Sequence, residues 1–450
     1  MKIKSIFPRA LAAILILISI TSMSFSLNAD EATLSYSDAL AAFKADMEDP
    51  EHIDTVASAY LYCLSTETEL LDFDADPSNK KSPGETAKLL TALTAYSLIE
   101  DQDQTVKVTS SMASRFTGHR YGYKKDDIVS YRDLLKTLTV RNANDSAIIL
   151  AYALCGNIQD FAYQMNLKAS ELGLKNSYFT NPTGDYDSRM YTTARDIFLV
   201  ANSFHGNKEL MRYVGSQYIR LDNGSLIYNR NYLISSYYNG GKSYLNSSAT
   251  GMVAGSSSES GYVIARSQVY DSYEYICVIL GATKDQHFIY SYDVSAELIK
   301  WGSKNHSFLS ILDKNTPVTT LPVKNAREND TVPIVPSDTL TKYMLSSAFE
   351  SGKLRTEMTF TQSELTAPIA SGTDVGEICV YYEDELIIKS RLLTACEISE
   401  NTTSSMIHTV WNAISSKRAT KVYIVVALCV LLYILINSII RYQRRIRRNS

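Results

Sequence analysis

A carboxylate and an amine stand three residues apart at the start of an apolar helix. Glu85 and Lys88 follow the pair Pro83-Gly84, and an apolar run with helical spacing begins at Leu89. This order predicts a helix that enters the core by its first turn. Residues three apart share a helical face, so we expect an ion pair worth about 0.3–1 kcal/mol. Nucleophilic attack by Glu85 is disfavoured, because it would give a mixed anhydride that water opens readily.

A polar insertion interrupts the strongly helical residues 131–155. It contains Asn142, Ala143 and Asn144, with apolar periodic residues on both sides. Asparagine is a good capping residue, so the simplest interpretation is that these two asparagines end one helix and begin the next. A role in binding is the alternative.

The remaining pattern predicts an α/β (α+β) fold. Strands are expected at 57–64, 70–73, 262–266 and 275–280, and helices at 36–48, 160–172, 192–204 and 293–301. Strands, then helices, then strands and a closing helix indicate an antiparallel sheet covered by helices. Alternating residues at 378–382 and 386–388 predict a hairpin in a second, small all-β domain.

Composition excludes several classes of protein. The 450 residues are 45% hydrophobic and 20% charged with a net charge of −4, which argues against disorder and against nucleic-acid binding. No Cys-x-x-Cys motif or His/Cys cluster occurs, so we expect no metal and no cofactor. Cys379 and Cys396 lie on adjacent predicted strands, where a disulfide is an open alternative. His119, His205 and His287 are isolated and are interpreted as solvated loop or packing residues.

Both ends of the chain carry membrane signals. Lys2, Lys4 and Arg9 precede an uncharged stretch that ends near Ala29, the pattern of a secretory signal peptide over residues 1–29. Residues 422–440 contain no charge and are long enough to span a bilayer. The arginine-rich tail 441–450 marks the cytoplasmic side of that span. We therefore expect a cell-membrane protein with one C-terminal span, its body outside the cytoplasm and its C-terminus inside.

The chain also resembles a known family. Residues 35–302 are similar to the serine-type D-alanyl-D-alanine carboxypeptidases, the low-molecular-weight penicillin-binding proteins of the β-lactamase/transpeptidase-like fold. Residues 315–397 are similar to the small β domain that follows the catalytic domain in that family. The matching stretches are each short, but they occur in the family's order: residues 57–60, 83–93, 144–145, 181–184, 192–196, 229–233, 249–252 and 259–262.

The resemblance implies that two motifs of the family site are altered in the helical part. The family uses Ser-x-x-Lys, in which lysine takes the proton of a nucleophilic serine. Glu85 stands at that serine, and Lys88 at the lysine. The family also uses Ser-x-Asn, in which the serine relays a proton. Asn142 takes the serine's place, whereas Asn144 keeps the asparagine.

The third motif, Lys-Thr-Gly on an edge strand, binds the substrate carboxylate in the family. Its flanking residues align it with Val253, Ala254 and Gly255, so only the glycine is kept. Other registers, such as Ser78 to Lys81, fit the flanking residues worse.

Three hypotheses follow from the resemblance. The first is a non-catalytic homologue that acts as a binding or scaffold module in peptidoglycan metabolism. The second is an active serine-type carboxypeptidase that trims muropeptides with unusual residues. The third is a structural partner of another wall enzyme with no ligand in its cleft. The implied partners are peptidoglycan stem peptides or wall-synthesis proteins, and the membrane through the C-terminal helix.

Overall fold

The computed structural model describes residues 36–46, 50–74, 76, 80–237, 243–348, 352–382, 385–415 and 417–446. The predicted signal peptide and the last four residues of the basic tail lie outside these ranges. The chain divides into two compact units. The first runs to Leu309 and includes Tyr343–Lys353, and the second comprises Ser310–Lys342 and the residues from Leu354 onward.

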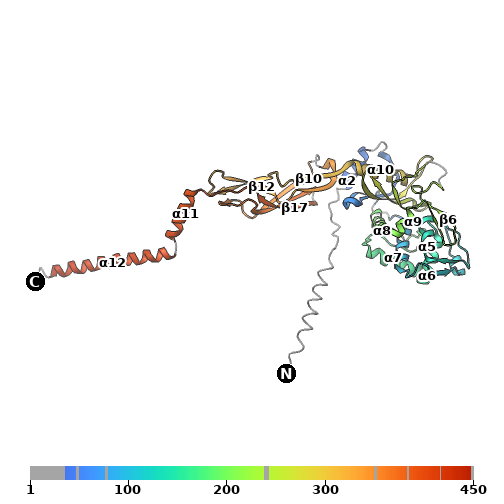
Figure 1. Ribbon diagram of the computed structural model, residues 1–450, viewed down its shortest axis with the longest axis horizontal. Helices are drawn as coiled ribbons and strands as arrows, with labels where there is room; N and C mark the ends of the chain where they lie inside the picture. The colour runs from blue at the N-terminus through green and yellow to red at the C-terminus, as the bar shows by residue number, and fades with distance from the viewer. Residues whose placement is uncertain are drawn as a thin grey trace, which may run out of the picture. The chain divides into compact units, whose positions relative to one another are not determined.

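The first unit is built on a five-stranded antiparallel sheet with the strand order β2-β1-β9-β8-β7. The central strands β8 and β9 are each buried at six successive positions, so helices must cover both faces. Figure 1 shows α2 and α10 together on one side of this unit and α5 to α9 on the other. Strand β7 forms one edge of the sheet.

The helices of this unit are α2 (Tyr36–Asp46), α3 (Ala87–Leu98), α4 (Ser110–Ala113), α5 (Tyr131–Arg141), α6 (Asn144–Cys155), α7 (Ile158–Glu171), α8 (Ala194–Gly206), α9 (Lys208–Val214) and α10 (Tyr290–Asn305), with short 3-10 turns at Pro50–Thr55, Leu64–Thr66 and Gly84–Thr86. Its strands are β1 (Ser58–Cys63), β2 (Thr68–Asp74), β3 (Thr105–Lys107), β4 (Ile128–Ser130), β5 (Tyr218–Arg220), β6 (Leu226–Tyr228), β7 (Ala249–Ser257), β8 (Gly261–Tyr270) and β9 (Tyr273–Ala282).

The predicted antiparallel sheet covered by helices is confirmed, and the local sequence explains where its helices begin. Thr193 accepts a hydrogen bond from the Asp196 backbone at the start of α8, and Asn157 does the same for Asp160 in α7. Such side-chain caps satisfy backbone N–H groups that the first helical turn leaves without partners.

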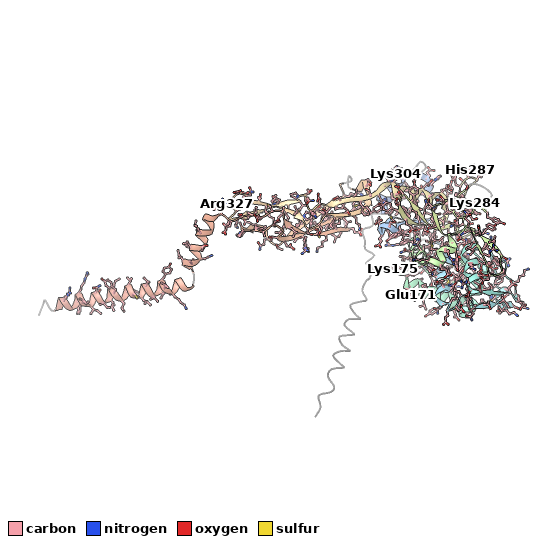
Figure 2. The ribbon with its side chains drawn as sticks, in the orientation of Figure 1. Glu171, Lys175, Lys284, His287, Lys304 and Arg327 are labelled. Atoms are coloured by element: carbon pink, nitrogen blue, oxygen red, sulfur yellow. The ribbon has the colours of Figure 1, made fainter. Side chains whose placement is uncertain are left out.

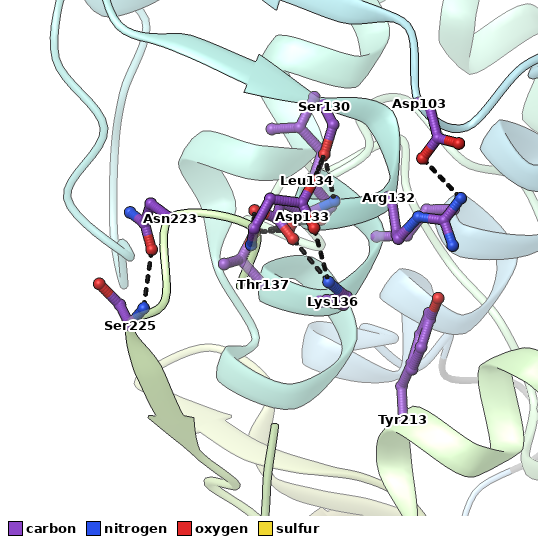
Figure 3. Close-up of polar contacts among 12 residues, drawn as sticks. Asp103, Ser130, Arg132, Asp133, Leu134, Lys136, Thr137, Tyr213, Asn223 and Ser225 are labelled. Atoms are coloured by element: carbon purple, nitrogen blue, oxygen red, sulfur yellow. Dashed lines mark hydrogen bonds and ion pairs between the residues drawn. The ribbon is translucent and has the colours of Figure 1, made fainter. Parts of the chain in front are cut away.

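A buried polar network fixes the start of α5 (Figure 3). The other end of this helix, at Asn142, lines the candidate site described below. Ser130 caps the helix by accepting from the Asp133 backbone. The Asp133 carboxylate lies 2.7 Å from the Lys136 ammonium, and it also accepts from the Asp222 backbone N–H at 2.8 Å. Thr137 donates to the Asp133 carbonyl at 2.7 Å. These contacts join the start of α5 to the segment that precedes β6.

The second unit contains a six-stranded sheet with the order β14-β16-β17-β12-β11-β15. The predicted hairpin is formed by β16 and β17, and its inward residues share an apolar core with β11 and β12. Cys379 and Cys396 are both free thiols, so the disulfide considered above is not formed. The strands of this sheet are β11 (Thr319–Lys324), β12 (Thr331–Pro336), β14 (Leu354–Phe360), β15 (Leu365–Thr366), β16 (Asp374–Tyr382) and β17 (Glu385–Thr394). A separate two-stranded sheet pairs β10 (His306–Leu312) with β13 (Leu340–Leu345), and neither strand lies wholly within the second unit.

Two helices follow this sheet, α11 (Thr402–Ser415) and α12 (Lys417–Ile446). Within α12, Lys421–Tyr442 is long and apolar enough to cross a membrane. This range contains the span predicted at 422–440.

The Asp133 network yields a prediction about stability. Replacing Asp133 with alanine removes the buried carboxylate that Lys136 and the Asp222 N–H share, and Lys136 keeps only a 3.4 Å pair with the more exposed Asp222 carboxylate. We expect the free energy of unfolding to fall by about 3 kcal/mol, the lower end for a broken buried pair, because the ammonium keeps this second partner. Denaturant unfolding of the full chain in detergent micelles, followed by near-ultraviolet circular dichroism, measures this loss.

The matched control is Glu171→Ala, which removes the ion pair between Glu171 and Lys168. This pair has the same 2.7 Å length as the pair between Asp133 and Lys136, but Glu171 lies at the surface of the first unit (Figure 2). An exposed pair is worth about 0–1 kcal/mol. Equal losses in the two variants would contradict the structural role of Asp133.

Candidate active site

A cleft of about 290 Å³ lies in the first unit, where three distant parts of the sequence meet. Its lining combines the turn before α3, the end of α5 and the edge strand β7 with an aromatic and basic rim. The residues are Glu85, His119, Asn142, Arg230, Tyr232, Ala254, Gly255, Ser256, Tyr262, Lys284, Ile289 and Tyr292.

Glu85 lies on the 3-10 turn Gly84–Thr86, which leads directly into α3. Gly84 has a φ of +50°, and a Cβ at this position would lie 2.7 Å from the Ser260 hydroxyl. The Thr86 hydroxyl closes the turn by donating to the Pro83 carbonyl at 2.6 Å. Glycine is therefore required at 84 for both its backbone conformation and its close approach. The turn places Glu85 two residues before Ala87, the first residue of α3.

The Glu85 side chain rests on Gly255 of β7. A Cβ built on Gly255 would lie 2.5 Å from Cγ of Glu85 and 2.6 Å from its Cδ. Only glycine leaves room for this contact. Oε2 of Glu85 is buried and has no hydrogen-bond partner, so this oxygen does not form the ion pair that we predicted with Lys88.

Lys88 is buried within the first turn of α3, the turn by which we predicted that this helix enters the core. Burial is the largest influence on its side chain and lowers the pKa of the ammonium. The negative charges of Glu85 and Asp185 oppose this effect, and the positive charge of Arg230 reinforces it. The charge of Glu85 therefore partly offsets the effect of burial on the pKa of the Lys88 amine.

Asn142 joins α5 to the edge strand. It is the C-cap of α5 in the left-handed conformation with φ of 53°, and its side-chain amide donates to the Ala254 carbonyl at 2.8 Å. The cap predicted at this position is confirmed. Asn144 is instead the first residue of α6, and its amide donates to Asp185 at 3.0 Å, outside the cleft lining. The capping role predicted for Asn144 is therefore wrong.

The Val253-Ala254-Gly255 segment lies in β7 with its members in different environments. Ala254 and Gly255 line the cleft, next to Asn142 and Glu85. The Val253 side chain is only 3% exposed and packs in the apolar core of the unit. The structure thus brings together four of the seven predicted site residues at the cleft, with Lys88 buried behind Glu85.

Sequence reasoning missed the basic part of the rim. His119 was interpreted as an isolated loop or packing residue, but it lines the cleft and lies 3.1 Å from the Arg230 guanidinium. Burial, followed by the positive charges of Arg230, Arg141 and Lys88, lowers the pKa of His119 to about 4. The imidazole is therefore neutral at pH 7. No periodic pattern marks His119, although Arg230 lies within a stretch that supports the family resemblance.

Aromatic side chains form another part of the rim. The Tyr232 and Tyr292 rings stack with centroids 5.7 Å apart, and the Tyr292 ring also stacks on Tyr244 at 4.8 Å. The Lys284 ammonium lies 5.6 Å from the centre of the Tyr262 ring. Within the described ranges, no group of three or more His, Cys, Asp or Glu side chains could hold a metal ion.

Asp145 holds a loop close to this site, and the sequence gave no sign of its role. Its carboxylate accepts hydrogen bonds from the backbone N–H groups of Tyr121, Gly122 and Tyr123 at 2.8–3.0 Å. His119 lies two residues before Tyr121, and its carbonyl accepts a hydrogen bond from the Asn144 N–H at 2.7 Å. The start of α6 therefore fixes the segment that carries His119.

Known proteins match both units. A family model described as D-alanyl-D-alanine carboxypeptidase matches residues 50–284, and one described as the C-terminal domain of penicillin-binding protein 5 matches residues 309–400. The D-alanyl-D-alanine carboxypeptidase DacF of Bacillus subtilis (strain 168) is 22% identical over 339 residues, covering 73% of this chain and 82% of DacF. DacD of Escherichia coli (strain K12) is 26% identical over 278 residues, covering 62% of this chain and 68% of DacD.

Two solved structures share the fold at lower identity. The D-alanyl-D-alanine carboxypeptidase DacD from Francisella tularensis is 21% identical with a TM-score of 0.53, covering 77% of this chain and 94% of its own. Penicillin-binding protein 5 from Haemophilus influenzae is 20% identical with a TM-score of 0.52, covering 77% of this chain and 98% of its own.

The His119 environment yields a prediction about pKa. Among the positive charges near the imidazole, that of Arg230 lowers the pKa of His119 most. Arg230→Gln removes this charge, so the pKa should rise from about 4 toward its ordinary value. It should stay below 6.5, because burial remains the largest cause of the lowering. Titration of the full chain, labelled with carbon-13 histidine and followed by NMR, measures this change.

His306 is the internal control for that titration. Burial lowers its pKa to about 4 as well, but no arginine contributes. Its pKa should stay constant in Arg230→Gln. A constant His119 pKa in the variant would show that Arg230 does not act on the imidazole.

Proposed function

The chain belongs to the D-alanyl-D-alanine carboxypeptidase family, as its motifs predicted, and we propose that it is a non-catalytic member that binds peptidoglycan stem peptides. The proposal rests first on Glu85. A carboxylate at the family's serine position lacks the hydroxyl that attacks a carbonyl carbon, and its side chain fills the space above Gly255.

Two further positions support the loss of turnover. Asn142 uses its amide to hold the Ala254 carbonyl, and an amide cannot relay a proton to a leaving amine as a hydroxyl does. Val253 and Ala254 provide neither the cation nor the hydroxyl with which the family's third motif holds a substrate carboxylate. Each change removes a different step of the reaction, so one compensating residue would not restore it.

The cleft keeps features that suit a peptide ligand. Strand β7 lies at the edge of its sheet, where an extended peptide can pair with backbone groups. Arg230 and Lys284 bring positive charge to the rim, which can attract a terminal carboxylate. The stem peptide would then lie between β7 and the aromatic rim without being cut.

We further propose that α12 anchors the protein in the cell membrane. The span Lys421–Tyr442 is followed by basic residues, which favours a cytoplasmic C-terminus and an extracytoplasmic body. A body on that side of the membrane would have access to the cell wall.

A structural partner of wall-synthesis proteins with no ligand is the second candidate function. The contact between Glu85 and Gly255 favours it, because the Glu85 side chain occupies space at the strand edge that a ligand would use. Calorimetric titration of the full chain with a diacyl peptide ending in D-Ala-D-Ala separates the two candidates. Binding without release of D-alanine supports the stem-peptide function, and absence of binding supports the structural partner.

The absence of a nucleophile predicts that penicillin forms no covalent adduct with this chain. The full chain should remain unlabelled by a fluorescent penicillin, and its intact mass should not change, because Glu85 has no hydroxyl to acylate. An active member of the family, treated in parallel, shows that the reagent works. A mass increase of one drug molecule that maps to the cleft would overturn the non-catalytic assignment.

Repair of the site should require more than one substitution. Glu85→Ser recreates a serine one helical turn before Lys88, but carboxylate binding and proton relay stay absent. General acid help is typically worth about 10²–10⁴-fold in rate. We expect D-alanine release only when Asn142→Ser, Val253→Lys and Ala254→Thr are added, measured for each partial variant and for the fourfold one.

Val253 is buried in the core, so a lysine at this position can destabilise the fold. A thermal melt of each repair variant therefore accompanies the assay. Release by Glu85→Ser alone at the rate of the fourfold variant would show that the other two motifs are wrongly aligned.

A further inference from the structure

The hairpin formed by β5 and β6 presents stacked tyrosines to solvent. Tyr218 and Tyr228 are cross-strand partners with ring centroids 5.9 Å apart. The Tyr237 ring lies parallel to that of Tyr228, with centroids 3.9 Å apart and an interplanar angle of 5°. Tyr218 is 55% exposed and Tyr237 is 60% exposed. We call these three residues the tyrosine face.

The core does not require these rings. The opposite side of the hairpin carries Ile219 and Ile227, which pack against the main core. The hairpin therefore packs its two isoleucines inward, leaves Tyr218 exposed and leaves Tyr228 half-buried. Rings that gather at the surface in this way are available for binding.

The tyrosine face adjoins the cleft along the chain. Tyr228 lies two residues before Arg230, which lines the cleft, and Tyr237 lies five residues after Tyr232, another lining residue. The Arg230 backbone N–H donates to the Val140 carbonyl at 3.0 Å, which joins this segment to the end of α5. A ligand that extends from the cleft along this segment would therefore meet the tyrosine face.

We propose that the tyrosine face binds a neutral saccharide chain, namely the glycan that carries the stem peptide; this inference rests on the proposed function. The face of an aromatic ring is electron-rich and attracts the weakly positive C–H groups on the flat side of a sugar ring. Tyrosine hydroxyls offer hydrogen bonds to sugar hydroxyl and amide groups.

The chemistry of the face favours a sugar over other ligands. A polyanion would need several exposed cations, whereas the strands of the hairpin carry a single arginine, Arg220, and no lysine. A protein interface of ordinary size would need a larger apolar surface, and Leu226 is the aliphatic side chain exposed on the same strands. Stacked rings with hydroxyl edges suit a ligand that is flat, uncharged and rich in hydroxyl groups.

The test uses the full chain in detergent micelles and a tetramer of N-acetylglucosamine, which carries no peptide. We expect calorimetry to detect binding to the wild-type chain. Tyr237→Ala and Tyr218→Ala should each weaken it by about two- to tenfold, the equivalent of one aromatic contact. Tyr237→Phe keeps the ring and should bind nearly as well as the wild type. Tyr163→Ala is the matched control, since Tyr163 on α7 is 62% exposed and lies outside the tyrosine face.

The outcomes distinguish this inference from the proposed function. Failure of the wild-type chain to bind the saccharide, or equal binding by Tyr237→Ala, overturns the inference. A change of oligomeric state in Tyr237→Ala with unchanged saccharide binding would assign the face to a second copy of the chain, and would also overturn it. Failure to bind a D-Ala-D-Ala peptide, with saccharide binding intact, would count against the proposed function alone.

Discussion

The contact between Glu85 and Gly255 determines what the cleft can do. It places a carboxylate side chain flat against the backbone of an edge strand, at a distance that any Cβ on residue 255 would prevent. The contact depends on the turn at Gly84, which brings the start of α3 to β7. No group in the part of the chain that the structure describes donates a hydrogen bond to Oε2 of Glu85. The fold thus places a carboxylate at the point where its helices meet its sheet.

The surrounding structure holds this contact in place through two independent connections. Asn142 joins the end of α5 to Ala254, next to Gly255, and α5 is itself fixed at its other end by the Asp133 network. Asp145 fixes the loop that leads from His119. Each connection uses a buried polar group with satisfied partners, which specifies one arrangement of the cleft walls. Such a wall suits recognition of a ligand, whereas turnover also needs a nucleophile and a proton relay.

The sequence predicted the framework better than the rim. Apolar periodicity located the helices around residues 131–155 and the strands β8 and β9, because burial on a regular element leaves a repeating pattern. The order of short motifs placed Glu85, Asn142 and Gly255 in one site. His119, Lys284 and Tyr292 escaped notice because two loops and the first turn of α10 bring them together, and isolated polar or aromatic residues carry no period. The possible disulfide failed because Cys396 lies beyond the end of β17, whereas Cys379 of β16 is opposite Lys389 in the hairpin.

The charge of Glu85 has a second consequence, which acts through Lys88. A lysine serves as a base only when its amine is neutral. Burial lowers the pKa of Lys88 and so favours the neutral amine. The negative charge of Glu85 works against burial and stabilises the ammonium form. A neutral serine at the same position would remove that charge and leave burial less opposed. Glu85 therefore affects the site twice, because it replaces the hydroxyl and also favours the protonated form of the amine that would activate one.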